Sequence, residues 1–248
     1  MNGLMLHCGA LAASLDRIAA VPTPPPSATH YPIPHAALIG QVRGQLLDAG
    51  ITIEEEAYGL SHEGARVFGV LALKACHLPT VKGSDLVLGI RNSHDKTFVA
   101  GLALGNRVFV CDNLSFYGTR TLARKHTRFV ERDLPGLIAH ILGKLGDWAA
   151  RQAEMITAYE DTTLSDEQAH DFMIRSVRTG VIAPSRLPVV IDGWHREDHP
   201  RHLWSLFNDF TEALKGTLEI HELARRTERL HGLADLSVAK VRGLPPPS

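Results

Sequence analysis

The stretch "DLVLGIRNSHDKTFVAGLALGNRVFVCDNL" (85–114) sets the architecture, because its apolar runs have the length of strands and enclose a polar block. "DLVLGIRN" (85–92) is typical of one strand. "TFVAGLAL" and "RVFVCDNL" flank Gly105–Asn106, which is a signal for a two-residue hairpin turn. The stretch therefore predicts antiparallel strands that reverse direction at Gly105–Asn106.

The flanking segments extend this sheet and then turn helical. "ITIEEEAYGL" (51–60) and "ARVFGVLALK" (65–74) flank the turn "SHEG" (61–64), where Gly64 can supply a left-handed position. Strands followed by helices, rather than alternating with them, favour an α+β fold. We expect an antiparallel β-meander sheet at about residues 51–130, packed by C-terminal helices. Helical periodicity and capping signals predict these helices at 35–50, 133–164, 165–180, 204–216 and 219–236.

Length and composition are typical of one soluble globular domain. The chain has 248 residues, 44% of them hydrophobic and 21% charged. We expect a single α+β domain over 1–248, made of a proline-rich N-terminal arm (1–34), a helix plus the sheet (35–132) and a helical part (133–240). The formal net charge is −1, so an anion-binding surface has to be a local patch.

Cysteine usage and hydropathy point to the cytoplasm. The three cysteines are widely spaced and form no CxxC, which argues against a disulfide framework and a structural zinc site. No run approaches the ~20 apolar residues of a membrane span, and the N-terminus lacks the basic region of a signal peptide. We expect a cytoplasmic location, no membrane partner and no cofactor.

The polar block at 91–96 is the first candidate site. A two-residue loop at Gly105–Asn106 would bring "NSHDK" (92–96) and "CDN" (111–113) to the same end of the sheet. His94, Asp95 and Asn113 are therefore expected to share a surface pocket. Asn, Ser and Asp also make tight connections by bonding their own backbone, so a purely local role for Asn92, Ser93 and Asp95 stays open.

An enzyme would draw on the same block. Ser93, His94 and Asp95 are consecutive, so their side chains diverge and cannot form a catalytic relay. Cys111 has the chemistry of a nucleophile, although a small buried hydrophobe is the commoner role. Carboxylates and imidazole suit a divalent ion, but no HExxH-like spacing supports a metal site. The alternative metal set is His94, Asp95 and Asp112, and the alternative catalytic set adds Asn113.

Other histidines give weaker signals. His195, His199 and His202 in "GWHREDHPRH" (193–202) have the i, i+4, i+7 spacing of one helical face. Pro200 makes that helix doubtful, because proline removes an amide donor and clashes with the preceding turn. We therefore favour a surface loop for this segment.

The segment "YGTRTLARKHTRFVER" (117–132) is strongly basic, with five cations against the single acid Glu131. Its threonines favour a strand, and its charges are one-sided as a strand or as a helix. Basic groups beside aromatic rings suit single-stranded nucleic acid, since cations follow phosphates and rings stack on bases. A solvated charged face is the alternative. The predicted nucleic-acid surface comprises Arg91, His94, Lys96, Phe116, Tyr117, Arg120, Arg124, Lys125 and Arg128.

Several blocks together resemble the DUF932 family, the "phage/plasmid-like protein" group of unknown function. These blocks include "YGLSHEGARVFGVLAL", "LGIRNSHDKTFVAGLALGNRVFVCDNLSF", "ARKHTRFVERDLPGLI" and "WSLFNDFTEALKG", and they cover nearly the whole chain. "LSFYGTR" departs from the family, which more often has an alanine and a small residue followed by Gly-Glu. The resemblance implies a gene carried by phages, plasmids and other mobile genetic elements, and it supplies no reaction.

The expected topology is also similar to the core of Rad52-like single-strand annealing proteins. This analogy implies binding or annealing of single-stranded DNA in recombination or replication, and a homo-oligomer that could be ring-like. Fold analogy alone does not give function. Two other functions stay open: a metal-dependent nuclease or hydrolase, and a host-factor-binding protein whose interface lies on the C-terminal helices.

Overall fold

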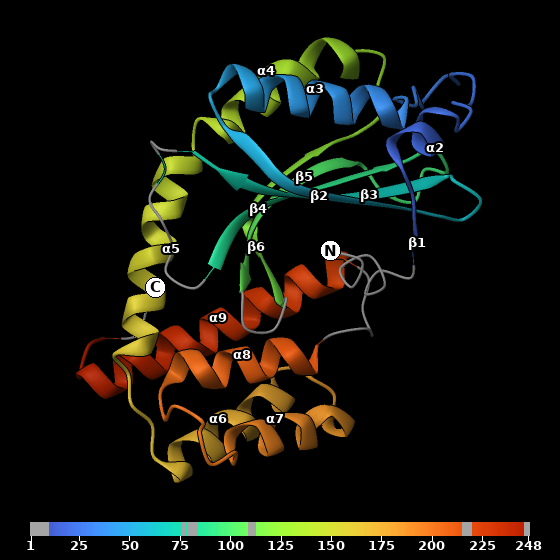
Figure 1. Cartoon of the computed structure of the whole chain (residues 1–248). Helices are drawn as coiled ribbons and strands as arrows, with labels where there is room; N and C mark the ends of the chain where they lie inside the picture. Colours follow the sequence, from blue (N-terminus) through green and yellow to red (C-terminus); the bar gives the residue numbers. More distant parts are fainter. Residues whose placement is uncertain (1–9, 76–77, 79–83, 109–112, 215–219, 246–248) are drawn as a thin grey trace.

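The computed structural model describes residues 10–75, 78, 84–108, 113–214 and 220–245. A twisted sheet lies between a pair of helices on one side and a helical layer on the other (Figure 1). None of the helices in these ranges is both long and apolar enough to cross a membrane.

The sheet is an antiparallel meander with strand order β1 to β6. This confirms the expected α+β class and the meander topology. The first strand pairs only with the end of the second, at Leu11 and Leu60. The strands are β1 (Leu11–Ala12), β2 (Thr52–Ser61), β3 (Arg66–Lys74), β4 (Ser84–Ser93), β5 (Ala100–Val108) and β6 (Asn113–Arg124).

All five segments predicted to be helical are helical, but one of them is divided, and the helices at Leu15–Ala19 and Leu187–Trp194 were not predicted. Residues 133–164 form two helices rather than one, because the chain turns at Gly143 and Lys144 between buried Leu142 and Leu145. The predicted capping box of Ser165 and Gln168 is present. The helices are α2 (Leu15–Ala19), α3 (His35–Asp48), α4 (Val130–Leu142), α5 (Leu145–Glu160), α6 (Asp166–Arg178), α7 (Leu187–Trp194), α8 (Leu203–Ala213) and α9 (Ile220–Arg242), with a 3-10 turn at Pro184–Arg186.

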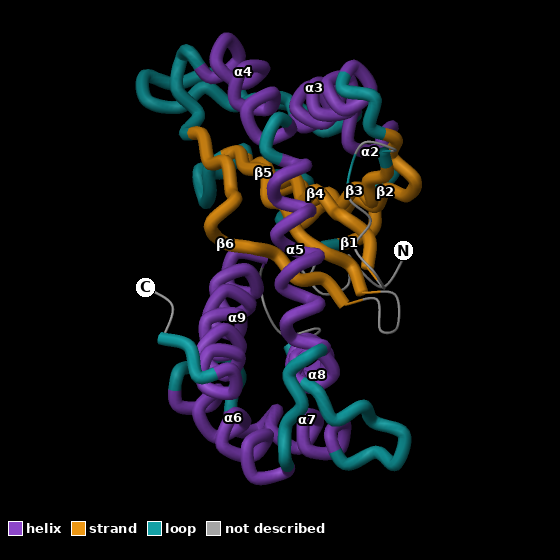
Figure 2. The backbone as a smooth tube through the Cα atoms, turned by 90° about the vertical axis from the view of Figure 1, so that its left-hand side faces the viewer, coloured by secondary structure: helices purple, strands orange, loops and turns teal. Residues whose placement is uncertain are grey.

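The layers are clear in two views. Helices α3 and α4 cover one side of the sheet, and α8 and α9 lie on the other side near β6 (Figures 1 and 2). Helix α5 runs from the first layer to the second, and α6 and α7 lie outermost. One hydrophobic cluster runs through the molecule, from Val42 on α3 and Leu88 on β4 to Phe207 on α8.

The predicted turn at Gly105–Asn106 is wrong. Strand β5 continues through both residues and pairs with β4 along its length, with Gly105 opposite Val87. Its pairing with β6 places Ala100 opposite Arg124 and Val108 opposite Asn113. Eight residue steps at about 3.3 Å separate these two ends by about 26 Å. "NSHDK" and Asn113 therefore lie at opposite ends of the sheet, and the predicted shared pocket of His94, Asp95 and Asn113 does not form.

Candidate functional site

The end of the sheet near residue 94 gathers four segments that are distant in the sequence. Because β6 ends opposite Ala100, the residues after it meet the β4–β5 connection (94–99). The proline-rich arm and the first turn of α3 join them through hydrogen bonds described below. We call the resulting set of buried polar side chains the sheet-end cluster: His30, His35, Asn92, His94 and His126.

Asn92 is the centre of the sheet-end cluster and is fully buried. Its amide nitrogen donates to the Ile33 carbonyl at 2.8 Å and to Nδ1 of His35 at 2.9 Å. Its amide oxygen accepts from Nε2 of His126 at 2.7 Å. One side chain therefore ties β4 to the arm, to α3 and to the segment that follows β6.

The histidines of the cluster complete this network. Nε2 of His35 donates to the Gly64 carbonyl at 3.0 Å, and Nε2 of His94 donates to the Ile33 carbonyl at 2.9 Å. The His35 and His94 rings stack at 3.8 Å, nearly parallel. His30 lies against His126, and within the described part of the chain its buried Nε2 has no hydrogen-bond partner.

Three of these imidazoles, those of His35, His94 and His126, are neutral at physiological pH. Burial lowers the pKa of His35 to about 4, and the neighbouring His94 adds to the effect. Burial also lowers the pKa of His126 to about 4, with contributions from His30 and His94. Burial likewise lowers the pKa of His94. An uncharged imidazole whose Nε2 is already bonded to a backbone carbonyl has little capacity to hold a phosphate, so the predicted phosphate contact at His94 loses its physical basis.

Ser93 and Asp95 act on their own loop. The Ser93 hydroxyl donates to the Phe98 carbonyl at 2.8 Å and accepts from the Phe98 amide. Asp95 accepts from Nε of Arg66 at 2.6 Å and from the Thr97 amide at 3.1 Å. Desolvation opposes ionisation of Asp95, but the bonds from Thr97 and Arg66 prevail and lower its pKa to about 2. The structure therefore favours the local role that the sequence left open for these residues.

Two predicted cations flank the cluster in different ways. Arg91 points to the sheet face opposite that of Asn92, since neighbours on a strand alternate, and its guanidinium lies 5.4 Å from the centre of the Phe98 ring. Lys96 is exposed on the β4–β5 connection, where its backbone is left-handed with φ of 64°. Of the two, Lys96 is the one available to a ligand at this end.

The segment after β6 presents an exposed cationic surface beside the cluster. Phe129 is 40% exposed, and the guanidinium carbons of Arg128 and Arg132 lie 4.5 and 4.6 Å from its ring centre. Val130 is buried and anchors the start of α4, which leaves Phe129 on the outside. Together with exposed Lys125, these side chains form what we call the Arg–Phe patch: Lys125, Arg128, Phe129 and Arg132.

The remaining predicted nucleic-acid contacts are placed less favourably. Arg124 is half-buried and pairs with Asp133. Between the pairs Ala103–Thr121 and Gly105–Phe116, strand β6 has four residues, 117–120, where β5 has one. For residues 113–123 the structure describes the backbone but not the side chains. The side chains of Phe116, Tyr117 and Arg120 therefore lie outside the description. Phe116 is near the far end of β6 from the Arg–Phe patch.

The alternative enzyme site is not assembled. Asn113 begins β6 at the end of the sheet opposite His94 and Asp95. Cys111 and Asp112 lie outside the described residues. Within the described ranges, no group of three or more His, Cys, Asp or Glu side chains is arranged to hold a metal ion. One surface hollow of about 510 Å³ is lined by Leu60 and Gly64 among others, and another of about 650 Å³ by Ile51 and Leu142 among others. Neither hollow is lined by the predicted site residues.

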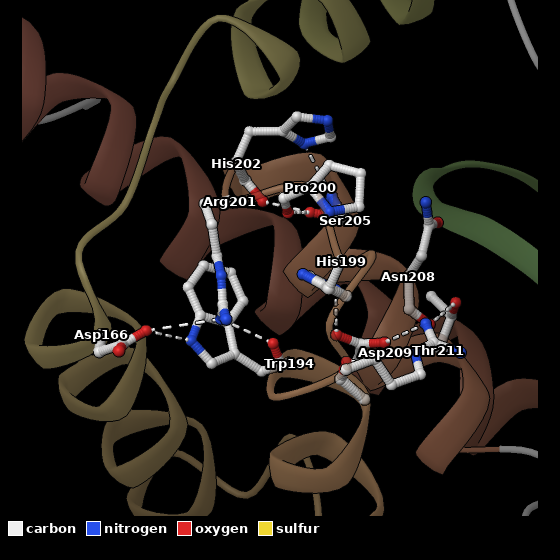
Figure 3. A network of polar contacts seen from close by, with 12 residues as sticks. Asp166, Trp194, His199, Pro200, Arg201, His202, Ser205, Asn208, Asp209 and Thr211 are labelled. Carbon is white, nitrogen blue, oxygen red and sulfur yellow. Dashed lines mark hydrogen bonds and ion pairs between the residues drawn. The ribbon is translucent and has the colours of Figure 1, made fainter.

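A second buried polar centre lies between α7 and α8 (Figure 3). Nε2 of His199 is 2.8 Å from Oδ2 of Asp209, close but not aligned for a hydrogen bond. Burial raises the pKa of Asp209 to about 7, although Arg196 opposes this, and burial lowers the pKa of His199. Asp209 fits against Gly193, where any Cβ would clash with the carboxylate. The sequence predicted a surface loop for residues 193–202, whereas Gly193 and Trp194 belong to α7 and His199 is buried.

Sequence reasoning missed His35 and His126 as partners of Asn92, His30 as the neighbour of His126, and Phe129 as the exposed ring. The spacing of Arg128, Phe129 and Arg132 could have indicated the patch, since residues three apart on a helix are neighbours. No comparable signal existed for the histidines, whose bonds join residues 34 to 61 positions apart.

Comparisons with known proteins add nothing to this description. The scan against protein-family models and the searches of curated proteins and solved structures gave no match. The resemblance to DUF932 and the analogy to annealing proteins stay expectations from the sequence.

Proposed function

We propose that this protein binds single-stranded nucleic acid through the Arg–Phe patch. The observation that carries the proposal is an exposed aromatic ring with two guanidinium carbons within 4.6 Å of its centre, in a chain whose net charge is −1. The contacts come from residues 125–132 rather than from the full set expected from the sequence.

The patch has the two chemistries that single strands need. Lys125, Arg128 and Arg132 can neutralise successive phosphates, and Phe129 offers a face for one base. Asp133 forms ion pairs with Arg124 and Arg132 and so offsets part of the positive charge of this segment. It forms no ion pair with Lys125 or Arg128. Lys96 on the β4–β5 connection lies at the same end of the sheet and can extend the cationic surface.

The sheet-end cluster supports this patch without touching a ligand. The bond between Asn92 and His126 fixes the backbone directly after Lys125, and the Tyr31 amide donates to the His126 carbonyl at 2.9 Å. A rigid support lowers the conformational entropy lost when the exposed side chains engage a partner. Recombination, replication or annealing would be the setting that the analogy of topology to single-strand annealing proteins implies.

Fluorescence anisotropy of a labelled single-stranded oligonucleotide at low salt tests the proposal. We expect Arg128→Ala/Arg132→Ala to weaken binding at least tenfold, and Phe129→Ala to weaken it by about 1–3 kcal/mol through lost stacking. Unlabelled single-stranded RNA and double-stranded DNA serve as competitors, and single strands should compete best.

The matched control is Arg151→Ala/Arg178→Ala, which removes the same charge from exposed positions on α5 and α6. We expect its affinity to stay within twofold of the natural sequence. Equal losses in both double variants would mean that net charge alone attracts the strand, and no detectable binding by the folded protein would remove the proposal.

A further inference from the structure

Two exposed histidines from different helices meet on the outer helical layer. His170 lies on α6, and His195 is the residue that ends α7. Their Nε2 atoms are 3.1 Å apart, and their ring centres are 5.3 Å apart. The sequence placed His195 with His199 and His202, whereas its actual neighbour is 25 positions away.

The backbone that carries this pair is held by a buried tryptophan. Nε1 of Trp194, a fully buried residue, donates to Oδ1 of Asp166 at 2.9 Å (Figure 3). Arg201 stacks 4.9 Å from the Trp194 ring and donates to the Trp194 carbonyl at 2.7 Å. Asp166 is one helical turn before His170, and Trp194 directly precedes His195, so the same contacts fix both histidines.

The distance between the two nitrogens matches metal ligation. Imidazole nitrogens bind zinc at about 2.0–2.1 Å, so two of them lie about 3.3 Å apart in a tetrahedral site and about 2.9 Å apart at adjacent corners of a square plane. The observed 3.1 Å falls between these values. A single shared proton also permits this distance, and a metal ion would replace that proton.

We propose that His170 and His195 bind one divalent transition-metal ion of the zinc, copper or nickel class through their Nε2 atoms. Neutral imidazole is the ligand that these ions favour. Since the described residues hold no closed group of three or more ligands, they supply two, and water or an external ligand fills the other positions. The proposal does not rest on nucleic-acid binding.

Bound metal would clip α6 to α7. An ion held only in the folded state stabilises that state in proportion to its saturation. Because an imidazole nitrogen must be unprotonated to coordinate a metal, acidification should release the ion.

Isothermal titration of the untagged, metal-free protein with Zn²⁺ and with Cu²⁺ at neutral pH tests the proposal. We expect one site, whose affinity for the metal ion falls at least tenfold in His170→Ala and in His195→Ala. The metal should also raise the Tm of the natural sequence, but not that of either variant. His140→Ala removes an exposed histidine on α4 and should leave the site intact. Mg²⁺ should give no rise.

Circular dichroism checks that each variant is folded. If an alanine variant does not fold, His170→Gln or His195→Gln is measured in its place. The proposal is overturned if the natural sequence binds neither ion. It is equally overturned if the variants bind with the same stoichiometry and affinity as the natural sequence, since the metal then lies at other residues.

Discussion

Lys125 and His126 are neighbours in the chain, yet they belong to two regions with different tasks. His126 is buried in the sheet-end cluster, where its ring is bonded to Asn92. Lys125 is exposed in the Arg–Phe patch. The buried region has the residue types of an active site, but its donors and acceptors bond one another and backbone carbonyls of the same chain. The exposed region has fewer functional groups, and they face solvent.

This difference shows how polar residues divide between support and binding. A buried polar group without a partner costs free energy, so a bonded network specifies one arrangement of the segments that it joins. An exposed cation contributes little to folding and stays available to a ligand. The following changes separate the two regions by their effects on folding and on binding.

Asn92→Ala should have the largest effect on stability. It removes three hydrogen bonds and leaves His126 Nε2 and His35 Nδ1 buried without that partner. We expect a loss of about 3–5 kcal/mol in the free energy of unfolding, measured by urea denaturation. Ser93→Ala, which removes only a contact within one loop, should cost about 1 kcal/mol. Similar values for the two variants would contradict the central role of Asn92.

Acid should weaken the sheet-end cluster. Unfolded histidine titrates near 6.5, and burial lowers the pKa of His35 and His126 to about 4. Between these values the unfolded chain binds more protons, so stability is present above about pH 6.5 and is lost as the pH falls towards 4. Each ring should contribute about 3 kcal/mol to this loss.

His126→Gln measures that contribution, because glutamine can donate to Asn92 and cannot be protonated. We expect the acid-induced loss of stability between pH 6.5 and 4 to shrink by about 3 kcal/mol relative to the natural sequence. Urea denaturation at several pH values gives both curves. Parallel curves would mean that His126 is charged in the folded protein.

Asp209→Asn should act in the opposite direction. Burial raises the pKa of Asp209 to about 7, against 3.8 for the free side chain, so the folded chain holds an extra proton between these values. The stability from this proton is present below about pH 4 and is lost as the pH rises through 7. Asparagine avoids ionisation, and we expect Asp209→Asn to gain about 4 kcal/mol relative to the natural sequence on going from pH 4 to 8. A relative loss over that range would contradict a protonated carboxyl.

Arg128→Ala/Arg132→Ala should have the smallest effect on folding. Both side chains are exposed, and Arg132 pairs with Asp133 only at the surface. We expect the free energy of unfolding to change by less than about 1 kcal/mol. A larger loss would place the patch in the same structural role as the cluster.

The sequence predicts more of the fold than of the candidate site. Alternating apolar runs and the capping box of Ser165 indicated the meander and the helices, because these signals are local. Gly105 and Asn106 misled, since their turn preference is weaker than continuous pairing of β5 with β4. The polar block was correctly singled out, but its partners Ile33 and His35 lie about 60 positions away, and local patterns carry no record of such contacts.

The salt dependence of single-strand binding tests the central claim most directly. Four exposed cations, Lys96, Lys125, Arg128 and Arg132, predict a slope of about −3 for log affinity against log salt concentration. Arg128→Ala/Arg132→Ala should bring this slope to about −1.5, while Phe129→Ala lowers affinity and leaves the slope unchanged. A slope that stays near −3 in the double variant would show that the strand binds elsewhere and would contradict the assignment of the Arg–Phe patch.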